Sequence, residues 1–238
     1  MKTETGAARL FSEVDQGQPF HGWLPLGADL HQGLANPKGW AALHIVVQKL
    51  IETDSEIERK DLYDQILIVE NPGAVVVARH GDRVGMVQSF RFTGERLLTA
   101  DPGYVSALAN DGRFEELLTT LGRWQWELPK GLNPRDESTD LERLILNTAK
   151  LEAEQEAGYT IENARIAGRI NANPTFFAHA QYAVVADIRT VGENNPEELE
   201  MIGKVKLFTA SEIRKLTSEG EFEDGLSLAA LAIAGFNF

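Results

Sequence analysis

The chain has 238 residues, of which 43% are hydrophobic and 25% charged, a composition typical of a globular protein with one sizeable domain and an extension. Its formal net charge of −13 argues against nonspecific binding to nucleic acid or an anionic membrane, and the lack of cysteine excludes disulfides, thiolate metal sites and cysteine nucleophiles. The N-terminal sequence has no apolar signal region and no apolar run reaches about 18 residues, so we expect a cytoplasmic protein.

Residues 1–60 are expected to be an N-terminal extension, and residues 61–238 the main domain. Glycine and proline punctuate the first 40 residues, which suits a segment that wraps or extends a domain. The segment GWAALHIVVQKLIE, residues 39–52, fits either a short helix or a strand, and its periodicity does not decide between them.

Three β-rich runs separated by turn sequences follow, at residues 65–70, 74–79 and 83–92. Residues 112–124 carry apolar side chains at helical spacing and predict a helix. Residues 124–131, WQWELPKG, predict a strand that runs into a Pro-Gly turn.

A helix is expected at about residues 140–157. Thr139 and Glu142 have the spacing of a capping box, and Gly158 suits the position after the last helical residue. Strands and helices then follow, and together they predict an α+β domain with a mixed sheet flanked by helices. The strands are expected at 164–170, 181–188 and 204–208, and the helices after a second capping box at Thr209 and Glu212 and over 225–235.

Acidic residues crowd the end of the first of these helices, in the sequence LEAEQEAGY. Glu152 and Glu156 are four positions apart and share one face, Gln155 flanks it, and Glu154 points away. Like charges at this spacing destabilise a helix by a few tenths of a kcal/mol. A divalent cation bound by both carboxylates would replace that repulsion with coordination. The alternative interpretation is a solvated acidic surface helix.

Together, ELPKGLNPRDE and LEAEQEAGY resemble the signature of the Nudix hydrolases, a glycine-led loop entering a helix with Arg-Glu-x-x-Glu-Glu that ends in glycine. Matched from Gly158, Glu152 takes the first glutamate, and Gln155 and Glu156 take the pair. The resemblance extends over about residues 65–235 and implies a Nudix fold, an α/β/α sandwich.

The strand VGMVQSFRF and the sequence WELPKG are similar to the ADP-ribose pyrophosphatase branch of that family. This resemblance implies substrate contacts from Arg91 and Glu127, and the aromatic ring of Phe176 could stack on a base of the substrate. A surface arginine at a strand end is the alternative for Arg91, and core packing is the alternative for Phe176.

The resemblance also implies a site for Mg²⁺ or Mn²⁺. Glu152 and Glu156 match the side-chain ligands, and Gln155 could offer a carbonyl oxygen. Lys130 stands where the branch uses a main-chain carbonyl as a further ligand. The catalytic base of the branch comes from a late loop, here GENNPEELE, in which we favour Glu198 or Glu200. A plain solvated loop is the alternative for these residues.

The sequence departs from the family pattern at three places. The arginine of the signature is Leu151, and the first residue of the glutamate pair is Gln155. Between Glu137 and Leu151 lie 13 residues, six more than the seven of the family. These departures favour an alternative function, a nucleotide-binding or structural protein of the same fold with impaired catalysis.

The activity implied by the resemblance is hydrolysis of the pyrophosphate bond in ADP-ribose or a related nucleoside diphosphate sugar. The sequence LPKG is also similar to dinucleoside polyphosphate hydrolases, so the substrate stays open. The branch forms dimers partly through N-terminal strands, so we expect a homodimer with residues 1–60 at its interface.

Overall fold

The computed structural model describes residues 8–12, 41–52, 57–69, 71–92, 107, 110–113, 116, 122–133, 140–173, 180–196 and 201–238. The chain divides into two compact units. The first comprises residues 1–71 with 173–179, and the second comprises 72–172 with 180–238. The boundary expected at residue 60 falls inside a strand of the first unit.

The first unit contains a three-stranded antiparallel sheet of order β1-β2-β3. The segment at 39–52 whose periodicity was ambiguous forms strand β2, and its run of Ile45, Val46 and Val47 is rich in the β-branched residues that suit a pleated surface. The strands are β1 (Ala8–Ser12), β2 (Ala41–Glu52) and β3 (Ile57–Val69).

The second unit contains a seven-stranded mixed sheet of order β10-β5-β4-β9-β8, with β6 paired to β5 and β7 paired to β4. Strands β4 and β9 run parallel, and the other pairs are antiparallel. The strands are β4 (Gly73–His80), β5 (Arg83–Phe92), β6 (Gly122–Glu127), β7 (Lys130–Leu132), β8 (Tyr159–Ile170), β9 (Gln181–Val191) and β10 (Ile202–Thr209).

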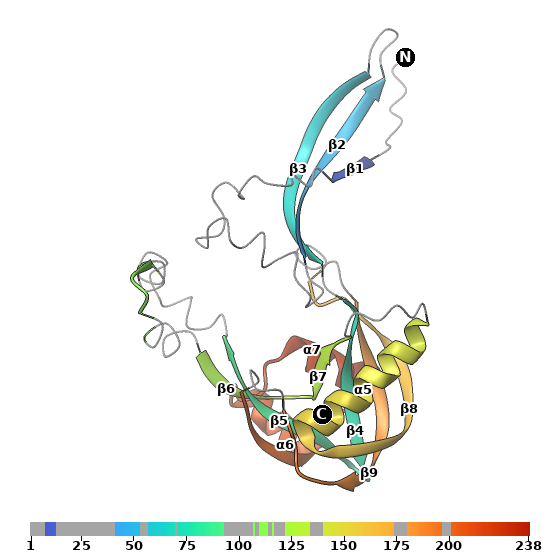
Figure 1. Ribbon diagram of the computed structural model, residues 1–238, viewed down its shortest axis with the longest axis vertical. Coiled ribbons are helices and arrows are strands. Elements are labelled where there is room, and N and C mark those ends of the chain that lie inside the picture. Colours follow the sequence, from blue (N-terminus) through green and yellow to red (C-terminus); the bar gives the residue numbers. More distant parts are fainter. Residues whose placement is uncertain are drawn as a thin grey trace. The chain divides into compact units, whose positions relative to one another are not determined.

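Helices cover both faces of this sheet, so strand β4 is buried on both sides (Figure 1). Ala74 and Val76 pack in the cluster that contains α5, whereas Val75 and Val77 pack in the cluster that contains residues of α6 and α7. This is the α/β/α arrangement expected from the sequence. The helices of the described residues are α5 (Leu141–Ala157), α6 (Ala210–Ser218) and α7 (Gly225–Ile233).

Two expected elements end differently from the prediction. The helix expected over 112–124 cannot extend to its end, because Gly122 begins strand β6 and Arg123 pairs with Arg91 of β5. The strand expected over 124–131 is two strands, because β6 pairs with β5 and β7 pairs with β4, and Pro129 between them has no N–H to donate to either ladder.

Candidate active site

Helix α5 carries the acidic face and begins one position later than its expected cap. Its N-cap is Asp140, whose side chain accepts a hydrogen bond from the Arg143 N–H at 3.1 Å. The predicted capping box of Thr139 and Glu142 is therefore wrong. Aspartate is the stronger N-cap residue, and it directly follows the threonine.

The C-terminal end of α5 is fastened to the loop that follows β9. Gly158 ends the helix as predicted, with a left-handed φ of 67° that favours glycine. Asn194 donates its side-chain amide to the Glu156 carbonyl at 3.1 Å, and the Asn195 N–H donates to the Gln155 carbonyl at 2.8 Å. These bonds satisfy carbonyls left open at a helix end. They place the start of the late loop against the last turn of α5.

The two glutamates of the shared face point into the protein. Glu152 is 8% exposed and Glu156 is fully buried, whereas Glu154 is exposed and Gln155 is half-buried. Because both of these glutamates are buried, this face of α5 is not the solvated acidic surface of the alternative interpretation.

The main chain of β7 lies against both buried carboxylates. The Lys130 N–H donates to Glu156 Oε2 at 2.9 Å. Glu156 Oε1 is buried and has no hydrogen-bond partner among the described residues. At the next position a Cβ would overlap the Glu152 carboxylate, so only glycine, here Gly131, allows this close approach.

Burial raises the pKa of Glu156 to about 8. The negative charges of Glu152 and Glu127 act in the same direction, while the hydrogen bond from the Lys130 main chain and the charge of Lys130 act against it. Glu156 is thus a buried acid with one unpartnered oxygen, and the positive charge of Lys130 only partly offsets the effect of its burial.

An ion-pair network lies next to these carboxylates. Arg91 binds Glu127 through Nη2 at 2.6 Å and Nε at 3.1 Å. Lys130 Nζ lies 2.6 Å from the other oxygen of Glu127 and 3.2 Å from Asp224 Oδ2. The network therefore joins β5, β6 and β7 to the N-terminus of α7.

Glu127 is ionised, and its two carboxylate oxygens contact Arg91 and Lys130. Its burial would raise its pKa, but the charge of Lys130 and the hydrogen bond and charge of Arg91 outweigh that effect and hold the pKa at about 2. Arg91 keeps 44% of its side chain exposed and can meet an anionic ligand. The predicted substrate contact of Glu127 stays a prediction, and within the fold its carboxylate orients the two cations.

Three predicted site residues lie outside the described residues, namely Phe176, Glu198 and Glu200. Two residues of the site were not predicted. Asp224 caps α7 by accepting from the Ser227 N–H at 2.9 Å, and the Ser227 hydroxyl accepts from the Leu128 N–H at 2.9 Å. Their Asp-x-x-Ser spacing is a helix-start signal that could have identified them.

The residues present fit a hard divalent cation with few protein ligands. In the part of the chain that the structure describes, no group of three or more His, Cys, Asp or Glu side chains could hold a metal ion. Mg²⁺ needs no such group, because it commonly uses one or two carboxylates together with waters and phosphate oxygens. The unpartnered Oε1 of Glu156 beside Glu152 supplies the matching donor set.

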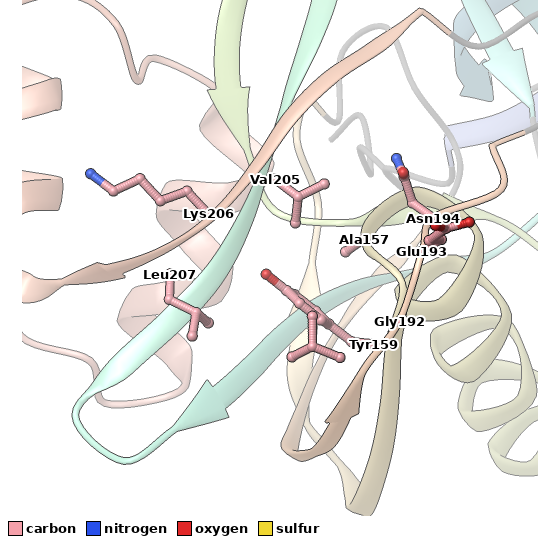
Figure 2. Close-up of a pocket in the computed structure, with 9 residues that line it drawn as sticks. Ala157, Tyr159, Gly192, Glu193, Asn194, Val205, Lys206 and Leu207 are labelled. Atoms are coloured by element: carbon pink, nitrogen blue, oxygen red, sulfur yellow. The ribbon is translucent and has the colours of Figure 1, made fainter.

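A cavity of about 410 Å³ opens at the C-terminal end of α5. It lies between the start of β8, the loop after β9, and β10 (Figure 2). Figure 2 shows the Tyr159 ring extending toward the Val205 and Leu207 side chains. The volume is within the range of roughly 300–1,000 Å³ of small-molecule pockets. The lining residues are Ala157, Tyr159, Val191, Gly192, Glu193, Asn194, Val205, Lys206 and Leu207.

The fold is similar to that of solved hydrolases. A structure described as an ADP compounds hydrolase superposes with a TM-score of 0.53 at 14% sequence identity, covering 82% of this chain and 84% of that chain. A Nudix hydrolase from Nitrosomonas europaea matches with a TM-score of 0.46 at 14% identity, covering 71% of this chain and 91% of that chain. No protein-family model matches the sequence, and no curated protein is significantly similar to it.

The first of these likenesses, at low identity, shows a shared fold and nothing further. The expected Nudix-like α+β fold, a mixed sheet with helices on both faces, is thereby confirmed. Among the helices that the structure describes, none is long and apolar enough to cross a membrane.

Proposed function

We propose that the protein is a Mg²⁺-dependent hydrolase that cleaves the pyrophosphate bond of ADP-ribose or a related nucleoside diphosphate sugar. The observation that carries this proposal is the buried pair of Glu152 and Glu156, with Glu156 Oε1 unpartnered. Burial of such a pair is unfavourable without a compensating charge, and a divalent cation held by the two carboxylates would supply that charge. The ADP compounds hydrolase of the same fold supports the substrate class.

In this proposal each described residue has a defined task. Glu152 and Glu156 would hold the cation, together with the main-chain carbonyl of Lys130 and the side-chain carbonyl of Gln155. A bound Mg²⁺ neutralises phosphate charge and favours attack of water on phosphorus. Arg91, held by Glu127, would bind a phosphate oxygen outside the cation, because its guanidinium is half-exposed and oriented.

The remaining tasks belong to the late loop and the cavity. We propose Glu198 or Glu200 as the base that accepts a proton from the attacking water. The main chain of Asn195 is hydrogen-bonded to the Gln155 carbonyl, so the loop in which these glutamates follow begins beside the last turn of α5. The cavity next to Ala157 offers space for one organic moiety of the substrate.

A second candidate function is binding of a nucleotide without hydrolysis. Leu151 is 41% exposed and provides no charge beside Glu152, and Gln155 provides one charge fewer than a glutamate. Both functions would be those of a cytoplasmic homodimer that binds neither nucleic acid nor membrane, in keeping with its net charge of −13.

The test is a panel of ADP-ribose, other nucleoside diphosphate sugars and dinucleoside polyphosphates, with Mg²⁺ or with EDTA. Release of nucleoside monophosphate that requires Mg²⁺ would support hydrolysis. Glu156→Gln should reduce the rate at least about 10²-fold, the scale of removing a principal electrostatic contributor. Glu154→Gln, an exposed change on the same helix turn, is the matched control and should leave the rate unchanged.

One outcome would contradict hydrolysis, and another would contradict the placement of the cation on α5. A full panel without nucleoside monophosphate release would leave nucleotide binding as the better candidate. A Glu156→Gln variant that hydrolyses its best substrate at the unmodified rate under saturating Mg²⁺ would show that α5 does not hold the cation.

A further inference from the structure

Helix α5 buries two carboxylates near its C-terminal end. Its last turn contains no basic residue, and Leu151, next to Glu152, is apolar and exposed. Removing a carboxylate from water costs several kcal/mol unless a positive charge or hydrogen bonds compensate. For Glu156, a compensating positive charge comes from another element of the fold.

Lys130 provides that compensation from the facing strand β7. Its side chain is only 14% exposed, and its ammonium lies between Glu127 and Asp224 at 2.6 and 3.2 Å. The other cation of the network, Arg91, is 44% exposed, so solvent screens its charge more strongly. Lys130 is thus the buried cation of this group.

The partners of Lys130 are themselves fixed by helix α7. Asp224 accepts from the Ser227 N–H and from the Ser227 hydroxyl at 2.9 and 2.5 Å. The same hydroxyl accepts from the Leu128 N–H at 2.9 Å. The segment from Glu127 to Lys130 is therefore attached to α7 both by its main chain and by the ammonium.

The main chain of Lys130 completes the connection to α5, because its N–H is the donor to Glu156 Oε2. We propose that Lys130 is the positioning residue of the candidate cation site: its buried ammonium anchors β7 between Glu127 and Asp224, and its main chain thereby orients Glu156. The inference rests on the proposed function, since it takes Glu152 and Glu156 to bind a divalent cation.

Lys130 has two effects on cation affinity, and they have opposite signs. Its positive charge repels a cation, so loss of the charge alone would raise affinity. Its contacts hold Glu156 in place, so loss of the contacts would lower affinity. If positioning dominates, Lys130→Met lowers affinity although it removes a repulsive charge, and the sign of the change distinguishes the two effects.

The experiment measures Mn²⁺ binding to the full chain by electron paramagnetic resonance, without substrate. Lys130→Met and Asp224→Asn should each weaken binding by about 10- to 100-fold, the range found for residues that orient metal ligands. Asparagine caps a helix as well as aspartate does, so Asp224→Asn breaks the ion pair and keeps α7. Lys215→Met, which removes an exposed lysine paired with Glu219, is the control and should leave binding unchanged.

The outcomes separate this inference from the proposed function. If the unmodified protein binds Mn²⁺ and both variants bind it equally or more tightly, the positioning role of Lys130 is overturned and the proposed function stands. If the unmodified protein binds no Mn²⁺, both are overturned. Circular dichroism establishes folding, and if Lys130→Met does not fold, Asp224→Asn alone decides.

Discussion

Lys130 and Glu156, which are 26 positions apart in the sequence, are joined by a hydrogen bond of 2.9 Å from the lysine main chain to the buried carboxylate. The bond connects β7 to the last turn of α5, so the glycine-bearing strand and the acidic helix end, which are far apart in the sequence, lie against each other in the fold.

Glu156 should make the metal-free protein less stable as the pH rises. Its pKa in the folded state is about 8, against an ordinary value of 4.5. A raised pKa contributes stability that is fully present below the ordinary value and is lost as the pH rises through the folded value. We expect the free energy of unfolding in EDTA to fall between about pH 5 and 9 relative to that of Glu156→Gln. Urea denaturation of both proteins measures this difference in the free energy of unfolding. If the free energies of the two proteins changed in parallel with pH, the prediction would be contradicted.

Gln155→Glu should strengthen divalent cation binding. The substitution adds a third carboxylate to the candidate cation site, beside Glu152 and Glu156, and affinity for a hard cation rises with the number of charged ligands. The same charge adds repulsion in the metal-free helix, worth a few tenths of a kcal/mol. Calorimetric titration with Mn²⁺ and thermal unfolding in EDTA measure the two effects. Weaker binding in the variant would count against a role for this position.

Gly131→Ala should weaken cation binding while the protein still folds. The new Cβ would overlap the terminal oxygens of Glu152, which can move aside by rotation of the side chain, so we expect a small loss of stability. The displaced carboxylate no longer faces Glu156, so Mn²⁺ affinity should fall about 10-fold or more. Gly225→Ala, where a Cβ meets nothing within 4 Å, is the matched control. Equal Mn²⁺ affinity in the two variants would contradict this account.

The protein is expected to be a homodimer. The chain mass is 26.3 kDa, and the segment of residues 1–60 is longer than the catalytic fold needs and too short for a sizeable core of its own. In a dimer, residues 1–60 would pack against a second copy of the chain and would need no sizeable core of their own. Sedimentation equilibrium should give twice the chain mass, and a mass of about 26 kDa at micromolar concentration would reject the dimer.

Local signals in the sequence predicted the elements that depend on neighbouring residues. The capping box of Thr209 and Glu212 is confirmed with both of its reciprocal bonds, because both partners lie within one helical turn. The box expected at Thr139 fails because Asp140, one position later, competes for the same role. Strand β2 was ambiguous, because an apolar run of this length fits both periods and pairing with β3 decides between them.

The environment of the candidate site depends on contacts that no local pattern contains. The spacing of Glu152 and Glu156 predicted a shared face but not its burial, to which the close approach of Gly131 to Glu152 and of the Lys130 main chain to Glu156 contributes. The network of Lys130 with Asp224 joins elements more than 90 positions apart and required the packing of α7 on the sheet. Long-range ion pairs of this kind follow from topology, not from spacing.

The three hydrogen bonds between the end of α5 and the loop after β9 have a mechanical consequence. Gly192 donates to the Gly158 carbonyl at 2.7 Å, and the bonds of Asn194 and Asn195 attach the Glu156 and Gln155 carbonyls of the last helical turn. A displacement of this turn is therefore transmitted directly to the loop main chain. The amide resonances of residues 192–195 thus serve as spectroscopic reporters of events at the buried carboxylates, without any label placed in the site itself.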